Sequence, residues 1–153
     1  MPDTDLSYDD ILVPTDGSGG TQPYLDQAIE LATQHDARIH ALYVVDTRVR
    51  SIVRDAVWPD VQSDIRVDAD TAVKSIEGAA KRADVDAVTA VRTGIPHDEI
   101  LAYADENDID LIVMATHGRS GPERAALGST TERVLRQAHV PVLTVRLDEH
   151  RRD

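Results

Sequence analysis

Leu111-Ile112-Val113-Met114 is a continuous apolar run that begins directly after Asp110. A strand without polar alternation is typical of a parallel sheet covered on both faces, because neither face then meets water. The run therefore predicts a buried parallel strand. Parallel neighbours need long crossover connections, which are usually helices, so the rest of the chain is expected to alternate strands with helices.

This alternation extends along the whole chain. Ile11-Leu12-Val13, residues 39–45 and residues 85–91 predict three strands before the apolar run. Residues 140–145 predict one strand after it, and Pro141 suits a strand start or a sheet edge. Strands of this number and spacing predict an α/β fold of three layers, in which helices cover both faces of a five-stranded parallel sheet.

Amphipathic stretches supply the helices between these strands. Apolar residues recur at helical spacing over 25–32, with Thr21 as the expected N-cap, and again from about Val61 to Ala83. A third helix is expected to carry Ile100, Leu101 and Ala104 on one side. Residues 46–59 show no clean period and predict a connecting excursion. We expect one domain over 1–153, with its core at about 8–146 and a charged tail at 148–153.

The charge balance excludes several classes of function. The 153 residues carry 28 acidic and 16 basic side chains, a net charge of -12, which would repel nucleic acid and an anionic membrane surface. The start of the chain shows no signal-peptide pattern, so we expect a cytoplasmic protein. The lack of cysteine excludes disulfides, thiolate nucleophiles and cysteine-type metal sites. The bias toward 21 Asp and only 2 Lys resembles cytoplasmic proteins of salt-in halophiles.

The residues after the fourth predicted strand carry the best candidate for a site, since parallel sheets bind ligands beyond the carboxyl ends of their strands. Glycines at 118, 121 and 128 allow a close approach of backbone to ligand. Ser129 and Glu132 form a capping-box pattern, with Ser129 as the expected N-cap. A helix start of this kind suits a phosphate, which Arg119 could also contact. Alternatively, the glycines only shape a surface loop and Ser129 only caps a helix.

The stretches 114–121 and 127–134 resemble the nucleotide loop of the universal stress protein family. The ATP-binding pattern of that family is glycine, two residues, glycine, nine residues, then glycine followed by Ser or Thr. The matching segment here is Ala115-x2-Gly118-x9-Gly128-Ser129, with the spacing kept and the first glycine replaced by alanine.

Two further stretches resemble the family. Residues 10–18 are similar to its opening strand and residues 141–143 to its closing strand, so the resemblance covers about residues 8–146. It implies a Rossmann-like fold with strand order 3-2-1-4-5 and a homodimer formed through the last strand, at about 140–146. It also implies a regulatory stress-response protein that binds ATP or a related adenine nucleotide and acts on a protein partner the sequence does not identify.

The resemblance implies a role for each matching residue. Asp16 would lie near the ribose or a nucleotide-bound Mg²⁺, Val44 would present backbone groups to the adenine edge, and the helix start at 128–130 would hold the phosphates. The full nucleotide-binding set implied in this way is Pro14, Thr15, Asp16, Val44, Met114, Ala115, His117, Gly118, Arg119, Gly128, Ser129 and Thr130.

Other chemistries lack their motifs. The sequence contains no Walker-type P-loop and no Gly-x-Gly-x-x-Gly, and Pro122 stands where a nucleophile elbow needs glycine. We therefore expect no enzyme and assign no catalytic residue. Two alternatives stay open: a dimeric scaffold that binds no nucleotide, which Ala115 and the negative charge favour, and a slow ATP hydrolase in which Asp16 holds a divalent ion. We further expect bound nucleotide to order residues 116–127.

Overall fold

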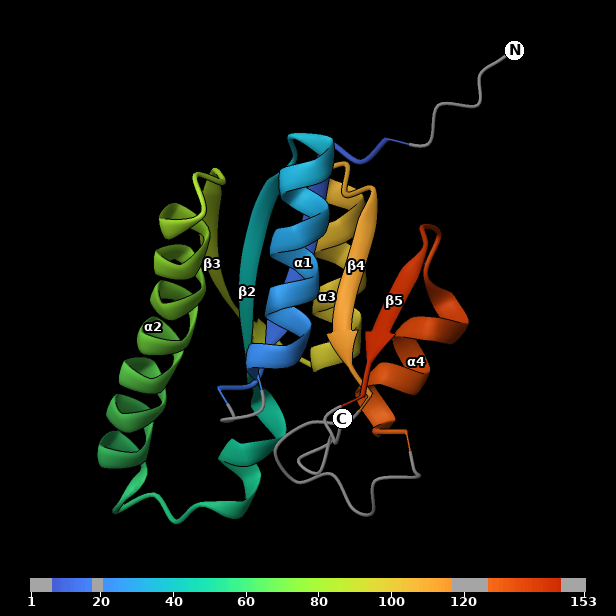
Figure 1. Cartoon of the computed structure of the whole chain (residues 1–153). Helices are drawn as coiled ribbons and strands as arrows, with labels where there is room; N and C mark the ends of the chain where they lie inside the picture. The colour runs from blue at the N-terminus through green and yellow to red at the C-terminus, as the bar shows by residue number, and fades with distance from the viewer. Residues whose placement is uncertain (1–6, 18–20, 117–126, 147–153) are drawn as a thin grey trace.

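The computed structural model describes residues 7–17, 21–116 and 127–146. Five parallel strands form one sheet in the order β3-β2-β1-β4-β5, so the predicted fold class and strand order are confirmed (Figure 1). The strands are β1 (Asp10–Thr15), β2 (Arg38–Asp46), β3 (Ala87–Gly94), β4 (Leu111–Ala115) and β5 (Val142–Val145). The helices are α1 (Thr21–His35), the 3-10 helix η1 (Thr47–Ile52), α2 (Trp58–Arg82), α3 (Pro96–Glu106) and α4 (Ser129–Gln137).

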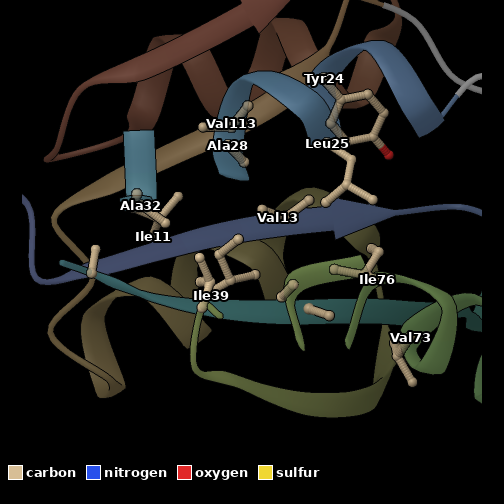
Figure 2. Packing of buried hydrophobic residues seen from close by; sticks show 14 of the residues in the cluster. Ile11, Val13, Tyr24, Leu25, Ala28, Ala32, Ile39, Val73, Ile76 and Val113 are labelled. Carbon is tan, nitrogen blue, oxygen red and sulfur yellow. The ribbon is translucent and has the colours of Figure 1, made fainter. Parts of the chain in front are cut away.

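The core lies on both faces of the central strand β1. Ile11, Leu12 and Val13 are each 0% exposed, which explains why this segment shows no polar alternation. Ile11 and Val13 belong to the cluster under α1 and α2, whereas Leu12 belongs to the cluster under α3 and α4. Figure 2 shows Leu25 of α1 beside Val13 in the first of these clusters. Because both faces are buried, polar functional groups can lie only at the two ends of the strands. We call the end where the strands begin the amino edge and the end where they finish the carboxyl edge.

Several boundaries differ from the sequence expectation for identifiable reasons. Helix α2 begins at Trp58 rather than Val61, because Pro59 falls in its first turn, where a missing N–H costs no hydrogen bond. Thr21 is the first residue of α1 rather than a cap that precedes it. Strand β3 begins at Ala87 and continues to Gly94, which pairs with Asp46 at the end of β2.

A buried polar network joins β1, β2 and α3 near the amino ends of the strands. The ring of His40 lies 2.7 Å from the Tyr103 hydroxyl through Nδ1 and 2.9 Å from Oδ1 of Asp10 through Nε2. A carboxylate oxygen accepts, so the contact with Asp10 places a proton on Nε2 of His40. Burial raises the pKa of Tyr103, so its hydroxyl stays protonated in the contact with Nδ1.

Helices α1, α2 and α3 end in the same backbone motif. In each, an aspartate adopts the left-handed conformation: Asp36 at φ 57°, Asp84 at φ 60° and Asp108 at φ 52°. The next residue is buried, and its N–H donates to the carbonyl of a buried alanine five residues earlier, the bond of a Schellman motif. The three donor–acceptor pairs are Ala37 to Ala32, Val85 to Ala80 and Ile109 to Ala104. Aspartate at this position adds negative charge to the negative end of the helix dipole.

None of the helices within the described ranges combines the length and the apolar character that crossing a bilayer requires.

The charge at the end of α3 gives the first testable prediction. Helix α3 has no basic residue in its last turn, so no cation of the helix itself offsets the charge of Asp108. Asp108→Asn keeps a residue that tolerates positive φ and removes the charge, and it should raise the free energy of unfolding by about 0.5 kcal/mol at low salt. The gain should vanish in multimolar KCl, where charges are screened. Chemical denaturation at both salt concentrations measures it.

Asp84→Asn is the matched control. Helix α2 carries Lys81 and Arg82 in its last turn, and these cations already offset the charge of Asp84. The control should therefore gain less stability than Asp108→Asn. Equal gains in the two variants, or a gain that does not depend on salt, would contradict the electrostatic explanation.

Candidate functional site

The candidate site lies at the carboxyl edge of the sheet, where β1 and β4 are neighbours. The chain crosses from β1 to β2 on one side and reaches β4 and β5 on the other, so the strand order reverses between β1 and β4. The carboxyl side of such a reversal point is where open parallel sheets bind ligands. The end of β4 and the start of α4 both lie at this edge, toward the bottom of Figure 1.

Hydrogen bonds from Tyr24 and Gly17 hold the turn after β1. Tyr24 of α1 is buried, and its hydroxyl donates to the carbonyl of Pro14 at 3.1 Å. Thr15 is buried as well, and its Oγ1 accepts the N–H of Gly17 at 3.0 Å. Gly17 has φ 81°, a conformation that favours glycine. These contacts fix the position of Asp16, which is half-buried between them.

The same turn leaves a backbone acceptor open on β2. The N–H of Arg38 faces β1 and the N–H of the next residue, Ile39, faces β3. Because the backbone N–H and carbonyl groups alternate in this way along β2, those of Val44, an even number of residues after Arg38, also face β1. The register pairs Thr15 with Tyr43, and continuing that ladder would bring the Gly17 N–H to the Val44 carbonyl. Because Gly17 donates to Thr15 instead, the Val44 carbonyl lacks this ladder bond and lies at the carboxyl edge.

Two hydrogen bonds among the described residues join the end of β4 to the start of α4, and a third joins the end of β4 to β5. The hydroxyl of buried Thr131 donates to the carbonyl of Ala115 at 2.9 Å, and the N–H of Gly128 donates to the carbonyl of Thr116 at 2.7 Å. The N–H of Thr116 donates in turn to Val145 of β5 at 3.1 Å. The first turn of α4 is therefore fixed beside the carboxyl edge. The sequence alone gives no signal for the role of Thr131, because the bond joins residues 16 positions apart.

The capping-box expectation is wrong. Gly128, not Ser129, is the N-cap, and it has extended geometry and no side-chain capping bond. Ser129 is the first helical residue and is exposed. The N–H groups of Ser129, Thr130 and Thr131 have no acceptor earlier in the helix, as in the first turn of any α-helix. With no capping side chain in front of them, these three donors carry the positive end of the helix dipole.

The remaining predicted residues divide into three groups. Met114 is buried under α3 and α4, and Ala115 packs against the cluster under α1, so both support the site from the core side. Thr130 is half-buried in the first turn of α4. His117, Gly118 and Arg119 lie outside the described residues, as does most of the segment 116–127 that nucleotide is expected to order.

Asp46 forms the rim of the site where β2 ends. Its carboxylate caps η1 by accepting the N–H of Arg48 at 3.0 Å. The Arg48 guanidinium also contacts both carboxylate oxygens, at 2.9 and 2.6 Å. These hydrogen bonds hold the pKa of Asp46 below its ordinary value. The paired carboxylate fixes the exit of the chain from β2, two residues after Val44.

A hollow of about 600 Å³ lies at the opposite, amino edge of the sheet. Its lining includes Arg38 and the carboxylates of Asp9, Asp10, Asp36, Asp84 and Asp86. So many carboxylates would repel a phosphate, and the carbonyl ends of α1 and α2 add to the negative potential. This hollow is therefore unsuitable for an anion such as a phosphate.

The fold and the carboxyl edge together define a Rossmann-like α/β protein with an uncapped helix start at its point of strand reversal. Comparison with known proteins identifies the family. The family model described as the universal stress protein family matches residues 7–146, and the chain belongs to this family.

Relatives and solved structures agree with this assignment. The chain is 36% identical to the universal stress protein MJ0531 of Methanocaldococcus jannaschii over 140 residues, which cover 91% of this chain and 82% of that protein. It is similar to the solved structure of the universal stress protein UspA from Lactobacillus plantarum, with TM-score 0.78 and 32% identity over 92% of this chain and 99% of that one. It also shares its fold with a universal stress protein solved in complex with cAMP, with TM-score 0.66 and 24% identity over 93% of this chain and 99% of that one.

The bond between α4 and β4 gives the second prediction. Thr131→Val keeps the shape of the side chain and removes the hydroxyl that donates to the Ala115 carbonyl, and it should lower the free energy of unfolding by about 1 kcal/mol. Urea denaturation followed by circular dichroism measures the change. Thr130→Val is the control, because no hydrogen bond of the Thr130 side chain is found among the described residues. A loss in the control as large as that in Thr131→Val would contradict the assigned role.

Proposed function

We propose that this protein binds ATP or a related adenine nucleotide at the carboxyl edge and acts as a regulatory factor in a stress response. The observation that carries the proposal is the junction of β4 with α4. There, Thr131 and Gly128 hold the first turn of the helix beside the point of strand reversal. The family member solved with cAMP has the same fold, which supports an adenine nucleotide as the ligand class.

The phosphate half of the site consists of the first turn of α4. The N–H groups of Ser129, Thr130 and Thr131 are the donors, and the exposed Ser129 hydroxyl adds a fourth. Gly128 carries no side chain in front of these donors, so a phosphate can approach the backbone closely. Its φ of -68° is open to any residue, which means that close approach rather than conformation explains glycine at this position.

The adenosine half lies between the turn after β1 and the end of β2. The Val44 carbonyl lacks the ladder bond from Gly17 and can accept from the adenine amino group. The half-buried Asp16 carboxylate, placed directly after β1, can accept from ribose hydroxyls or approach a nucleotide-bound Mg²⁺. Pro14 and Met114 are buried and support this half by packing.

Any Mg²⁺ would depend on the nucleotide. Across 7–17, 21–116 and 127–146, no group of three or more His, Asp or Glu side chains is arranged to hold a metal ion. Mg²⁺ in proteins is commonly held by one or two carboxylates together with substrate phosphates and water. Asp16 could provide the carboxylate, and the bound nucleotide would provide the phosphates.

The proposal is binding rather than turnover, since we identify no general base beside the phosphate half among the residues that the structure describes. The scaffold alternative relied on the extra methyl group of Ala115 and on the negative charge, and the acidic hollow at the amino edge places part of that charge away from the proposed phosphate half. That methyl packs against the hydrophobic cluster under α1 and α2, so the core accommodates it, and this favours a nucleotide binder over a scaffold.

We also propose a homodimer formed through residues 140–146. Strand β5 is an edge strand, and its four residues are all half-buried, so both its backbone edge and part of its apolar surface can accept a second copy. Size-exclusion chromatography with light scattering should give twice the chain mass. Thr144→Pro, which removes an N–H from this strand, should shift the protein toward the monomer. A wild-type monomer at all accessible concentrations would contradict this proposal.

The phosphate half gives a sharp test of nucleotide binding. Gly128→Asp places a carboxylate at the N-cap, where it would bond the N–H groups of Thr130 or Thr131 and repel a phosphate. Affinity for ATP, measured by calorimetry, should fall by about 100-fold or more. Stability should stay equal or rise, because aspartate is a preferred N-cap and its charge suits a helix start.

Gly128→Asn is the matched control. It offers the same size and the same capping bond without the charge, so it should lose about tenfold in affinity, and the difference between the two variants isolates the charge. Adenosine, which lacks phosphates, should bind all three proteins equally. ATP binding that Gly128→Asp leaves unchanged, in a protein that binds ATP, would place the phosphates elsewhere.

A further inference from the structure

The segment 47–57, between β2 and α2, differs from the rest of the molecule in charge and burial. It carries Arg48, Arg50 and Arg54 and only one acidic residue, Asp55, in a chain of net charge -12. None of the residues of η1 is buried, and Ile52 is 81% exposed. The segment lies beside the carboxyl edge, at the lower end of α2 in Figure 1. Neither the core nor the proposed nucleotide contacts explain these arginines.

Ser51 lies at the centre of this group of arginines. Arg48 precedes it by three residues, Arg50 by one, and Arg54 follows it by three. The side chain of Ser51 is exposed, and its hydroxyl donates to the Arg48 carbonyl at 2.8 Å, a contact on the surface of η1. The serine is therefore accessible in the folded protein.

The arginines are held by contacts that a stronger anion can displace. Arg48 pairs with Asp46, and Arg50 pairs with Asp55 at 2.8 Å and lies over the Trp58 ring at 4.8 Å. Arg54 makes no ion pair with any residue that the structure describes. Exposed pairs of this kind contribute little to stability. A short 3-10 helix without buried residues can also open locally at small cost, as a kinase substrate must.

We propose that Ser51 is a phosphorylation site for a protein kinase that selects arginine on the amino-terminal side of its acceptor. The Ser51 Oγ attacks the γ-phosphorus of the kinase's ATP, the bond from that phosphorus to the ADP oxygen breaks, and the hydroxyl proton passes to the kinase's base. Arg48 and Arg50 provide the charge pattern that such kinases recognise, and exposed Ile52 provides an apolar contact directly after the acceptor.

The modification would rearrange η1. The phosphorylated oxygen has no hydrogen to donate, so the bond from Ser51 to the Arg48 carbonyl is lost. A phosphate of charge near -2 gives the three arginines a better partner than a carboxylate, because it offers more oxygens and more charge. Arg48 would then leave Asp46, which fixes the exit of β2. The proposal does not depend on nucleotide binding, since every contact it uses lies within residues 46–58.

Ser63 provides an internal comparison. It is also exposed, on α2, but Asp60 lies three residues before it and Asp64 follows it directly. Acidic neighbours would repel both the arginine-directed kinase and the phosphate product. Phosphorylation of Ser51 but not Ser63 would therefore show that the kinase selects the charge around the serine and not merely an accessible hydroxyl.

The test uses the full-length folded protein, the catalytic subunit of an arginine-directed serine kinase and ATP, with tandem mass spectrometry to locate the phosphate. We expect phosphate on Ser51 and none on Ser63, and no incorporation in Ser51→Ala. Arg48→Gln should lower the rate by about tenfold or more, since it removes a recognised charge. Arg136→Gln is the control, because Arg136 is likewise exposed and paired with an acidic residue, and it should leave the rate unchanged.

Two results would overturn the proposal. One is no phosphate on Ser51 of the folded protein under conditions in which a peptide of residues 44–57 is modified. The other is phosphate on Ser51 at an equal rate when the kinase is omitted. A second measurement tests the rearrangement: in ³¹P NMR, the second pKa of phosphorylated Ser51 should lie below that of the same phosphopeptide, because the arginines stabilise the dianion. An unchanged pKa would contradict the exchange of partners by Arg48.

Discussion

Burial of β1 on both faces is the constraint on which the rest of the structure depends. Because Ile11, Leu12 and Val13 are completely enclosed, helices must cover each face of the sheet. The loops between strands and helices then lie at the two ends of the strands. Polar groups that act on a ligand can then lie only where strands begin or end. The two edges differ in charge: aspartates and helix carbonyl ends gather at the amino edge, whereas the start of α4 and three arginines lie at or beside the carboxyl edge. This difference is the physical reason to expect an anion at the carboxyl edge.

Most of the fold could be predicted because its determinants are local in sequence. Uninterrupted apolar runs predicted β1 and β4, and helical spacing predicted α1 and α3, since both patterns follow directly from burial. Helix boundaries were harder to predict where the same residue type is common both in a loop and at the start of a helix. Pro59 was taken as part of a loop although it opens α2, and Ser129 was taken as a cap although Gly128 occupies that position. The strand order came from the family resemblance and not from periodicity.

The site was predictable in outline and not in its contacts. Glycine spacing and the helix start pointed to the segment 128–130, and the structure places it beside the end of β4. The contacts that hold the site were not visible, because each joins residues whose proximity only the fold creates. Thr131 bonds Ala115 across a loop, Tyr24 bonds Pro14 across a turn, and the open carbonyl of Val44 results from the register of β1 with β2. No pattern within a single element carries this information.

The central claim, nucleotide binding at the carboxyl edge, is tested most directly on the wild-type protein purified in multimolar KCl. The nucleotide released on denaturation is identified first, and ATP is then titrated with Mg²⁺ by calorimetry in the same salt. We expect either a co-purified adenine nucleotide or binding of one ATP per chain with a dissociation constant in the micromolar range. No released nucleotide and no heat, from protein whose circular dichroism shows it to be folded, would contradict the account and favour a scaffold.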